Sequence, residues 1–137
     1  MPNIFIKPET LAFKNNNPGN LRFAKQTGAE PGEGGFARFP SPQEGYSALV
    51  RQVELDAGRG HNFETFINKY APPQENDTGG YLKFITDELG VEPDTLMSDI
   101  SAENIARAIA WKESNTKITD TQQEQIDKML KVYGGSL

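Results

Sequence analysis

The stretch SPQEGYSALVRQVEL, residues 41–55, decides the fold class, because it is where short extended segments give way to helical periodicity. Ser41 is a typical N-cap, Pro42 suits the first helical position, and Glu44 completes a capping box. Apolar residues then recur every three or four positions, as on the buried face of a helix. The predicted inner face comprises Tyr46, Leu49, Val50 and Val53. The pattern predicts a helix that ends before Gly58.

The same signals, namely an N-cap residue, apolar residues at helical spacing and a terminating glycine or proline, predict further helices downstream. They begin at Asn62, at about Thr78, at Ser101 and at about Thr121. Pro72 and Pro73 end the first of these helices. Gly90 ends the helix over 78–89, and Glu124 stands in the capping-box position of the last one.

The segment before Ser41 is rich in proline and glycine and contains short apolar runs that we interpret as strands. The runs are IFI at 4–6, LAF at 11–13, NLRFA at 20–24 and GFARF at 35–39. Leu21 and Phe23 alternate with a polar residue, and the glycine-rich segment 27–35 would join NLRFA to GFARF in a hairpin. We therefore expect a single α+β domain over 1–137 that is mainly helical, with about five helices and a small N-terminal β-hairpin.

Composition excludes several classes of function. The chain has 137 residues, no cysteine, one histidine (His61) and a formal net charge of -5. Disulfide frameworks, thiolate metal sites and cysteine nucleophiles are therefore excluded, and a site with several histidines cannot be built. The acidic balance argues against a nucleic-acid partner. We expect no metal, no cofactor, no signal peptide and no membrane span.

Four asparagines surround one turn in NNNPGNLR, residues 15–22. Turn chemistry explains one or two of them, because Asn tolerates left-handed backbone and bonds to neighbouring backbone groups. Several amides beside an arginine can equally present donors and acceptors to a neutral polar ligand such as a sugar. Both interpretations remain open at this point.

A second polar cluster is YAPPQENDT, residues 70–78. The two prolines end one helix, and Asn76 or Asp77 can cap the next. Capping is the favoured interpretation for Asp77. The functional alternative places Glu75 or Asp77 on the wall of a cleft, as an acid or as an orienting group.

Glu113 is the candidate general acid. Ile105, Ile109 and Glu113 lie four residues apart, so the carboxyl continues the apolar face of a helix. Burial at the end of that face would raise its pKa toward the value that a general acid needs near neutral pH. The alternative is a glutamate of the last helical turn that points into solvent.

Three motifs occur together in the chain, namely NNNPGNLRF at 15–23, GFARFPSPQEGYSAL at 35–49 and YAPPQENDTGGY at 70–81. Their combination resembles a family of small bacteriophage domains that are often described only as virion structural proteins. The asparagine turn and the stretch after it also resemble bacterial cell-wall glucosaminidases, which have the lysozyme-like fold. In those enzymes a catalytic glutamate ends a helix upstream of the turn, whereas here the upstream segment IFIKPETLAFK is too short for that helix. The resemblance therefore implies a lysozyme-like fold, and a circularly permuted order of elements would make Glu113 the acid.

The resemblance implies a phage-type peptidoglycan glycosidase, a muramidase or lytic transglycosylase that cuts the glycan backbone of the bacterial cell wall. Glu113 would protonate the glycosidic oxygen, and Glu75 would be the second carboxylate. The residues implied to bind sugar are Asn17, Asn20, Arg22 and Asn76, with Tyr70 or Tyr81 as a stacking face. The alternative is a non-catalytic virion structural or wall-binding module. The expected partners are glycan strands and other virion proteins, in the virion or after delivery to the periplasm.

Overall fold

The computed structural model describes residue 4 and residues 6–132, and the side chains of the last helix as far as Lys128. Helices dominate, and a two-stranded antiparallel sheet lies near the N-terminus. In chain order the elements are α1 (Leu11–Lys14), β1 (Glu30–Pro31), the 3-10 helix η1 (Glu33–Gly35), β2 (Ala37–Arg38), α2 (Pro42–Gly58), α3 (Phe63–Tyr70), α4 (Thr78–Leu89), the 3-10 helix η2 (Met97–Asp99), α5 (Ala102–Ser114) and α6 (Asp120–Val132). The predicted α+β class with mainly helical content is confirmed.

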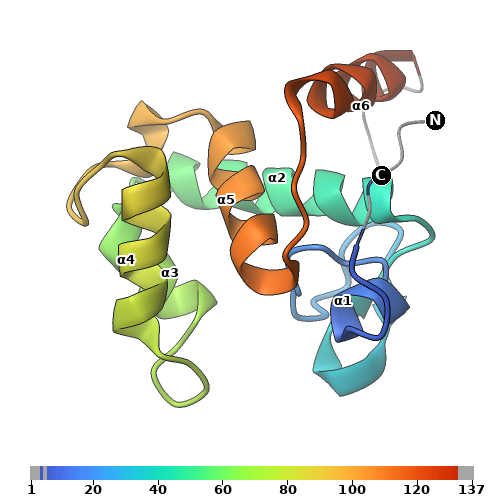
Figure 1. Ribbon diagram of the computed structural model, residues 1–137, viewed down its shortest axis with the longest axis horizontal. Helices are drawn as coiled ribbons and strands as arrows, with labels where there is room; N and C mark the ends of the chain where they lie inside the picture. The colour runs from blue at the N-terminus through green and yellow to red at the C-terminus, as the bar shows by residue number, and fades with distance from the viewer. Residues whose placement is uncertain (1–3, 5, 133–137) are drawn as a thin grey trace.

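The core forms where α5 crosses α2 and packs against α4, which in turn contacts α3 (Figure 1). The inward faces of these helices carry the large apolar side chains that lose all exposure to solvent. On α2 and α5 they are Tyr46, Leu49, Val53, Ile105 and Ile109. This face of α2 matches the predicted one except that Val50 is only half-buried. Burial of these side chains supplies the main favourable free energy of folding.

The helix starts follow from side-chain caps. Ser41, Asn62, Asp77 and Ser101 each accept a hydrogen bond from the backbone N–H three residues on. Such a bond satisfies one of the free N–H groups in the first turn of a helix. Gly90 ends α4 with a left-handed φ of 65°. The predicted starts of these four helices are confirmed, and Asp77 serves as a cap.

Two helix boundaries differ from the prediction. α2 includes Gly58, because the helical hydrogen bonding continues to Arg59, whose N–H donates to carbonyls in the last turn of the helix. The capping box of α6 uses Thr119 and Gln122 rather than Thr121 and Glu124. The Thr119 hydroxyl accepts from the Gln122 N–H at 3.1 Å, and the Gln122 amide oxygen accepts from the Thr119 N–H at 2.9 Å.

The N-terminal segment contains less strand than predicted. The run at 11–13 lies in α1, which Thr10 caps, and Ile4 and Ile6 are buried outside any strand. The segment 20–24 forms only an isolated bridge, between Arg22 and Phe36. The hairpin instead pairs β1 with β2, and β1 lies in the stretch predicted to be a loop.

Side-chain amides replace much of the missing strand pairing. The Asn17 amide nitrogen donates to the carbonyls of Leu21 and Ala37, and the Leu21 N–H donates to the Asn17 amide oxygen. Backbone groups bonded in this way need no neighbouring strand. The prediction of longer strands was wrong because nothing in the local pattern reveals these bonds.

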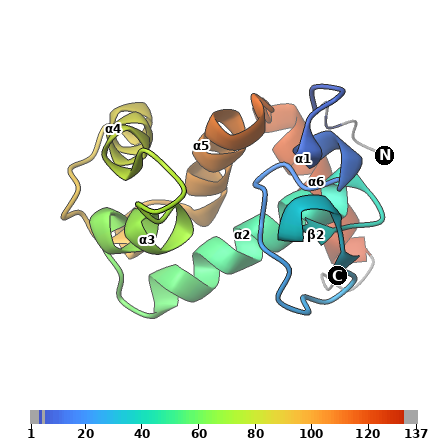
Figure 2. The same cartoon turned by 90° about the horizontal axis from the view of Figure 1, so that it is seen from below.

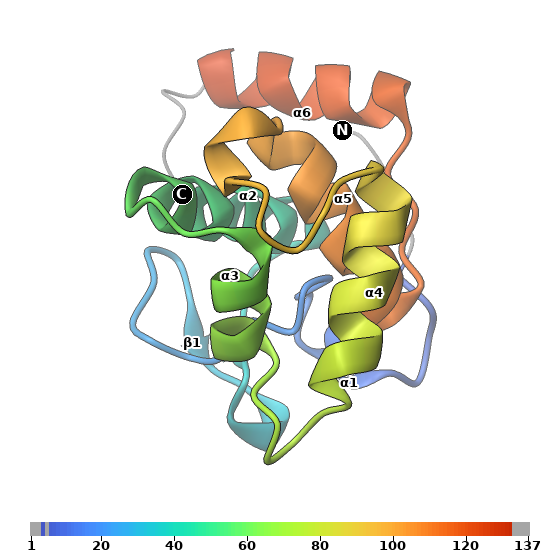
Figure 3. The same ribbon diagram turned by 90° about the vertical axis from the view of Figure 1, so that its left-hand side faces the viewer.

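The remaining elements form two groups, one at each end of α2. α3 and α4 lie near the C-terminal end of α2, and α1, the sheet and α6 lie toward its N-terminal end (Figure 2). Seen from the side, α3 and α4 stand next to each other and α6 runs across the opposite end of the molecule (Figure 3). Within the described residues, no helix is long and apolar enough to span a bilayer.

Gly45 is required where α2 meets the asparagine turn. A Cβ at this position would lie 2.0 Å from the carbonyl oxygen of Asn16. We expect Gly45→Ala to lower the free energy of unfolding by about 2–3 kcal/mol, because backbone must move to admit the methyl group. Urea denaturation measures the change.

Gly58→Ala is the matched control in the same helix, because a Cβ there has no heavy atom within 4 Å. It is expected to raise the free energy of unfolding by about 0.5 kcal/mol. Similar effects at the two glycines would contradict the close packing inferred for Gly45.

Candidate active site

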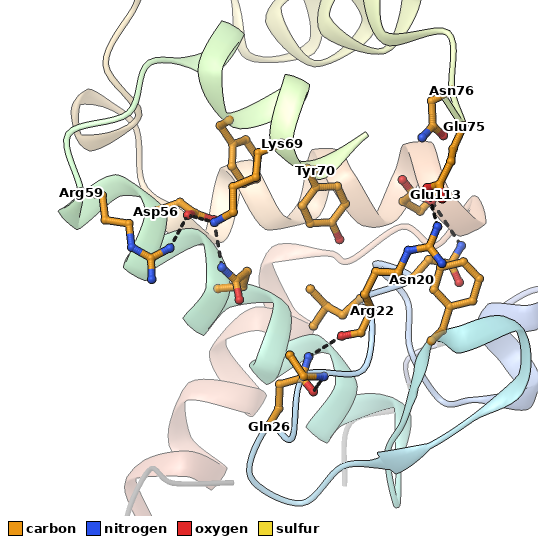
Figure 4. A pocket seen from close by; sticks show the side chains of 15 residues that line it. Asn20, Arg22, Gln26, Asp56, Arg59, Lys69, Tyr70, Glu75, Asn76 and Glu113 are labelled. Carbon is orange, nitrogen blue, oxygen red and sulfur yellow. Dashed lines mark hydrogen bonds and ion pairs between the residues drawn. The ribbon is translucent and has the colours of Figure 1, made fainter. Parts of the chain in front are cut away.

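A pocket of about 490 Å³ opens between the N-terminal segment and α3. Its walls come from the turn after Asn20, the C-terminal half of α2, α3, the loop at 75–76 and the end of α5. Figure 4 shows Glu113, Glu75 and Asn20 at one end and Asp56, Lys69 and Arg59 at the other. The fold therefore places in one cavity polar groups that are far apart along the chain.

Glu113 lies in the last turn of α5 and is half-buried in this pocket. Its carboxylate accepts hydrogen bonds from the Tyr81 hydroxyl at 2.7 Å and from the Asn20 amide at 3.3 Å. Burial raises the pKa of Glu113 above its ordinary value, although the bonds from Tyr81 and Asn20 oppose the shift. The side chain thus continues the buried face of α5 as predicted, and it does not point into bulk solvent.

The end of α5 is fixed against the asparagine turn by Ser114. Its hydroxyl, which is buried, donates to the carbonyl of Pro18 at 2.6 Å and lies 2.7 Å from the Thr116 hydroxyl. Asn115 then ends the helix with a left-handed φ of 55°. The sequence analysis missed Ser114 as a positioning residue, although Ser-Asn-Thr after an apolar helix is a usable signal for a helix stop.

The asparagines of the turn divide into structural and pocket residues. Asn15 and Asn17 are fully buried, and their amides bond to backbone. Asn17 lies outside the pocket lining, so the structure corrects the expectation that it contacts sugar. Asn20 lines the pocket, and its buried amide oxygen has no hydrogen-bond partner among the described residues.

Arg22 and Glu75 meet across the pocket. Their ion pair spans 2.5 Å, and each side chain is about half exposed, at 56% and 51%. The guanidinium also lies over the Phe36 ring, 4.9 Å from its centre. Glu75 therefore stands beside the pocket as a paired carboxylate, on the loop that faces Glu113 (Figure 4).

The two tyrosines occupy different places. Tyr70 lines the pocket and donates its hydroxyl hydrogen bond to the carbonyl of Gly19. Tyr81 is buried outside the lining, so of the two tyrosines predicted to supply a stacking face only Tyr70 is among the pocket residues. Burial raises the pKa of both hydroxyls, which keeps the Tyr81 proton in place as a donor to Glu113. Asn76 is exposed at the pocket wall.

Comparison with known proteins gives one informative match, and no family model matches the chain. Over 103 residues the chain is 30% identical to Protein P5 of Pseudoalteromonas phage PM2. This chain is related to a phage protein. The match covers 69% of this chain and 64% of the phage protein, so the chain spans less than two thirds of that relative.

The sequence analysis missed a charged cluster at the other end of the pocket. Asp56 of α2 is 1% exposed and accepts hydrogen bonds from Lys69 at 2.5 Å, Arg59 at 2.9 Å and Gln52 at 3.0 Å. Burial alone would raise the pKa of Asp56, but the hydrogen bonds from Lys69 and Gln52 outweigh it and lower the pKa. No short motif reveals this cluster, because Lys69 and Asp56 lie on different helices.

The pocket offers groups for acid–base chemistry. Among residue 4 and residues 6–132, no group of three or more His, Asp or Glu side chains could hold a metal ion. The carboxyls that line the pocket differ in their surroundings. Asp56 is held by cations and Glu75 is paired with Arg22, whereas the pKa of Glu113 is raised. The pKa values of Asp56 and Glu113 are thus shifted in opposite directions within one pocket, as general acid–base chemistry requires.

Proposed function

We propose that this phage-related chain is a peptidoglycan glycosidase, a muramidase or a lytic transglycosylase. The observation that supports the proposal is Glu113, a half-buried carboxyl with a raised pKa at the end of an open pocket. A raised pKa leaves more of the carboxyl protonated at a given pH than in an ordinary glutamate, which is the direction that general acid catalysis requires. The open pocket leaves room for a glycan strand, which a virion module with a filled groove would not have. A wall-binding module without catalysis would also have such a pocket, and the release of cleaved products distinguishes the two.

In the proposed reaction Glu113 transfers its proton to the glycosidic oxygen as the bond from that oxygen to the anomeric carbon breaks. The leaving sugar departs as an alcohol, and the remaining sugar develops oxocarbenium character. Asn20 is placed beside the reacting group, because it lines the pocket and its amide nitrogen donates to Glu113. The pocket wall also contains polar and aromatic side chains, namely Arg22, Tyr70 and Asn76.

Two outcomes remain for the oxocarbenium-like sugar. Water can add to it and return one proton to the Glu113 carboxylate, with Glu75 stabilising the charge, which gives a hydrolysed product. Alternatively a hydroxyl of the same sugar can add and return its proton to Glu113, which gives an anhydro product without consuming water. Mass spectrometry of muropeptides released from purified peptidoglycan tests the proposal, because the two products differ by one water. Release of neither from several wall types would favour the non-catalytic module.

The proposal also includes where the protein acts. Similarity to a phage protein fits a component of the virion that reaches the periplasm during infection, with glycan strands as substrate and other virion proteins as partners.

The pH dependence of cleavage tests the role of Glu113. The rate is expected to fall as pH rises through the pKa of Glu113, because only the protonated carboxyl can donate. The Tyr81 hydrogen bond favours the charged carboxylate and so opposes the raised pKa. Tyr81→Phe is therefore expected to move the falling limb of the rate profile to higher pH.

Initial rates of glycan release across a pH series, for the wild type and Tyr81→Phe, measure this shift. A falling limb that stays in place or moves to lower pH would contradict the assignment of Glu113 as the acid.

A further inference from the structure

The cluster around Asp56 provides more positive than negative charge. Lys69 and Arg59 both bond to the single carboxylate of Asp56, and the imidazole of His61 lies 3.9 Å from the same oxygen. Asp56 is 1% exposed, whereas the side chains of Lys69 and Arg59 are 49% and 54% exposed. The anion is therefore inside and the two cations face outward. They leave one net positive charge at the surface of the pocket.

Both cations keep donors that Asp56 does not use. An ammonium group has three N–H donors and a guanidinium has five, and the bonds to Asp56 engage one nitrogen of each side chain. Lys69 and Arg59 both line the pocket that contains Glu113. At the other end of the pocket the charges of Arg22 and Glu75 cancel. The Asp56 cluster is thus the positive end of a cavity in a chain of net charge -5.

We propose that Lys69 and Arg59 form an anion subsite that binds a carboxylate of the substrate. This inference rests on the proposed function. In peptidoglycan the carboxylates belong to the peptide stems carried by the muramic acid residues, so the subsite selects a peptide-substituted strand over a neutral glycan. Asp56 fixes the two cations in place, which reduces the entropy lost when a carboxylate binds. Tyr70 lies between this subsite and Glu113 in Figure 4.

The test compares two ligands that differ only in charge. The first is a disaccharide peptide from peptidoglycan with free carboxylates, and the second is the same molecule with its carboxyls amidated. Binding is measured by NMR titration to the Glu113→Gln protein, whose spectra also report whether the ligand stays intact. We expect the free carboxylate form to bind about 3- to 10-fold more tightly, and added salt to reduce this preference.

Two further variants locate the preference. Lys69→Gln and Arg59→Gln, each added to Glu113→Gln, are expected to lose most of it without weakening the binding of the amidated ligand. Each variant leaves Asp56 one cationic partner, so either suffices if the other fails to fold. Lys83→Gln is the charge-matched control, because Lys83 is exposed on α4 and pairs with Asp87 outside the pocket. This control is expected to keep the full preference.

Equal binding of the two ligands, a preference that survives both variants, or an equal loss in Lys83→Gln would overturn the anion subsite. Failure of the proposed function looks different. In that case wild-type protein releases no muropeptides, whether or not the two ligands and a neutral chitin oligosaccharide bind.

Discussion

Glu113→Gln is expected to reduce the release of muropeptides from peptidoglycan by about 10²–10⁴-fold. Glutamine keeps the shape of the side chain and can still accept from Tyr81 or Asn20, but it has no proton to give to the glycosidic oxygen. The loss should therefore appear in kcat more than in KM, because the proton moves only in the transition state. Initial rates of release, followed by mass spectrometry of the sugar ends, measure both parameters.

Folding of this variant is expected to be preserved. Since burial raises the pKa of Glu113, ionisation of the carboxyl destabilises the folded state as pH rises above the pKa of the unfolded chain. A neutral amide avoids that loss, so the variant should be at least as stable as the wild type at neutral pH. Glu64→Gln, at an exposed glutamate of α3 outside the pocket, is the control and should keep full activity. Undiminished release by Glu113→Gln would move the acid to Glu75 or another carboxyl.

Asn17→Ala is expected to lower the free energy of unfolding by about 3–5 kcal/mol. The side chain is fully buried and makes three hydrogen bonds to backbone, with donors and acceptors at Leu21 and Ala37. Alanine removes the partner of the Leu21 N–H and of the Ala37 carbonyl, and each such group costs about 1–3 kcal/mol, whereas the Leu21 carbonyl keeps its bond from the Ala37 N–H. Urea denaturation monitored by far-UV circular dichroism measures the change.

Asn68→Ala is a control for the removal of an amide. Asn68 is exposed on α3 and bonds only to the carbonyl of Glu64, so its replacement is expected to change stability by less than about 0.5 kcal/mol. A structural role and a sugar-binding role for Asn17 give different results. If Asn17 bound substrate directly, Asn17→Ala would raise KM and leave the unfolding midpoint unchanged.

The helices could be predicted because their signals are local. Ser41, Asn62, Asp77 and Ser101 act as caps within three residues of the groups they satisfy, and the apolar period continues from each cap. The N-terminal region could not be predicted in the same way. Its strands have two residues each, and much of its backbone is bonded by amide side chains from positions about 20 residues away.

In the candidate site, too, residues with a local signal could be predicted and residues brought together only by the fold could not. Glu113 could be found because it continues the spacing of Ile105 and Ile109 along one helix. Asn17 and Asn20 look alike in sequence, and only the fold shows that one is buried in backbone bonds and the other faces a pocket. The cluster of Asp56, Lys69 and Arg59 could not be predicted from the sequence, because Lys69 reaches Asp56 only when α2 packs near α3.

The hydrogen bond from Ser114 to Pro18 joins residues 96 apart in the chain, and the bond from Asn20 to Glu113 joins residues 93 apart. Contacts of such long range close a loop that contains most of the molecule, and they add to the contact order on which folding rate depends. The groups around Glu113 therefore assemble only after α2, α3, α4 and α5 have been made and docked. Until residues 18–113 have all been made and docked, the candidate acid has neither its hydrogen-bond donors nor its pocket. A chain that lacks part of this stretch carries Glu113 without the surroundings that raise its pKa.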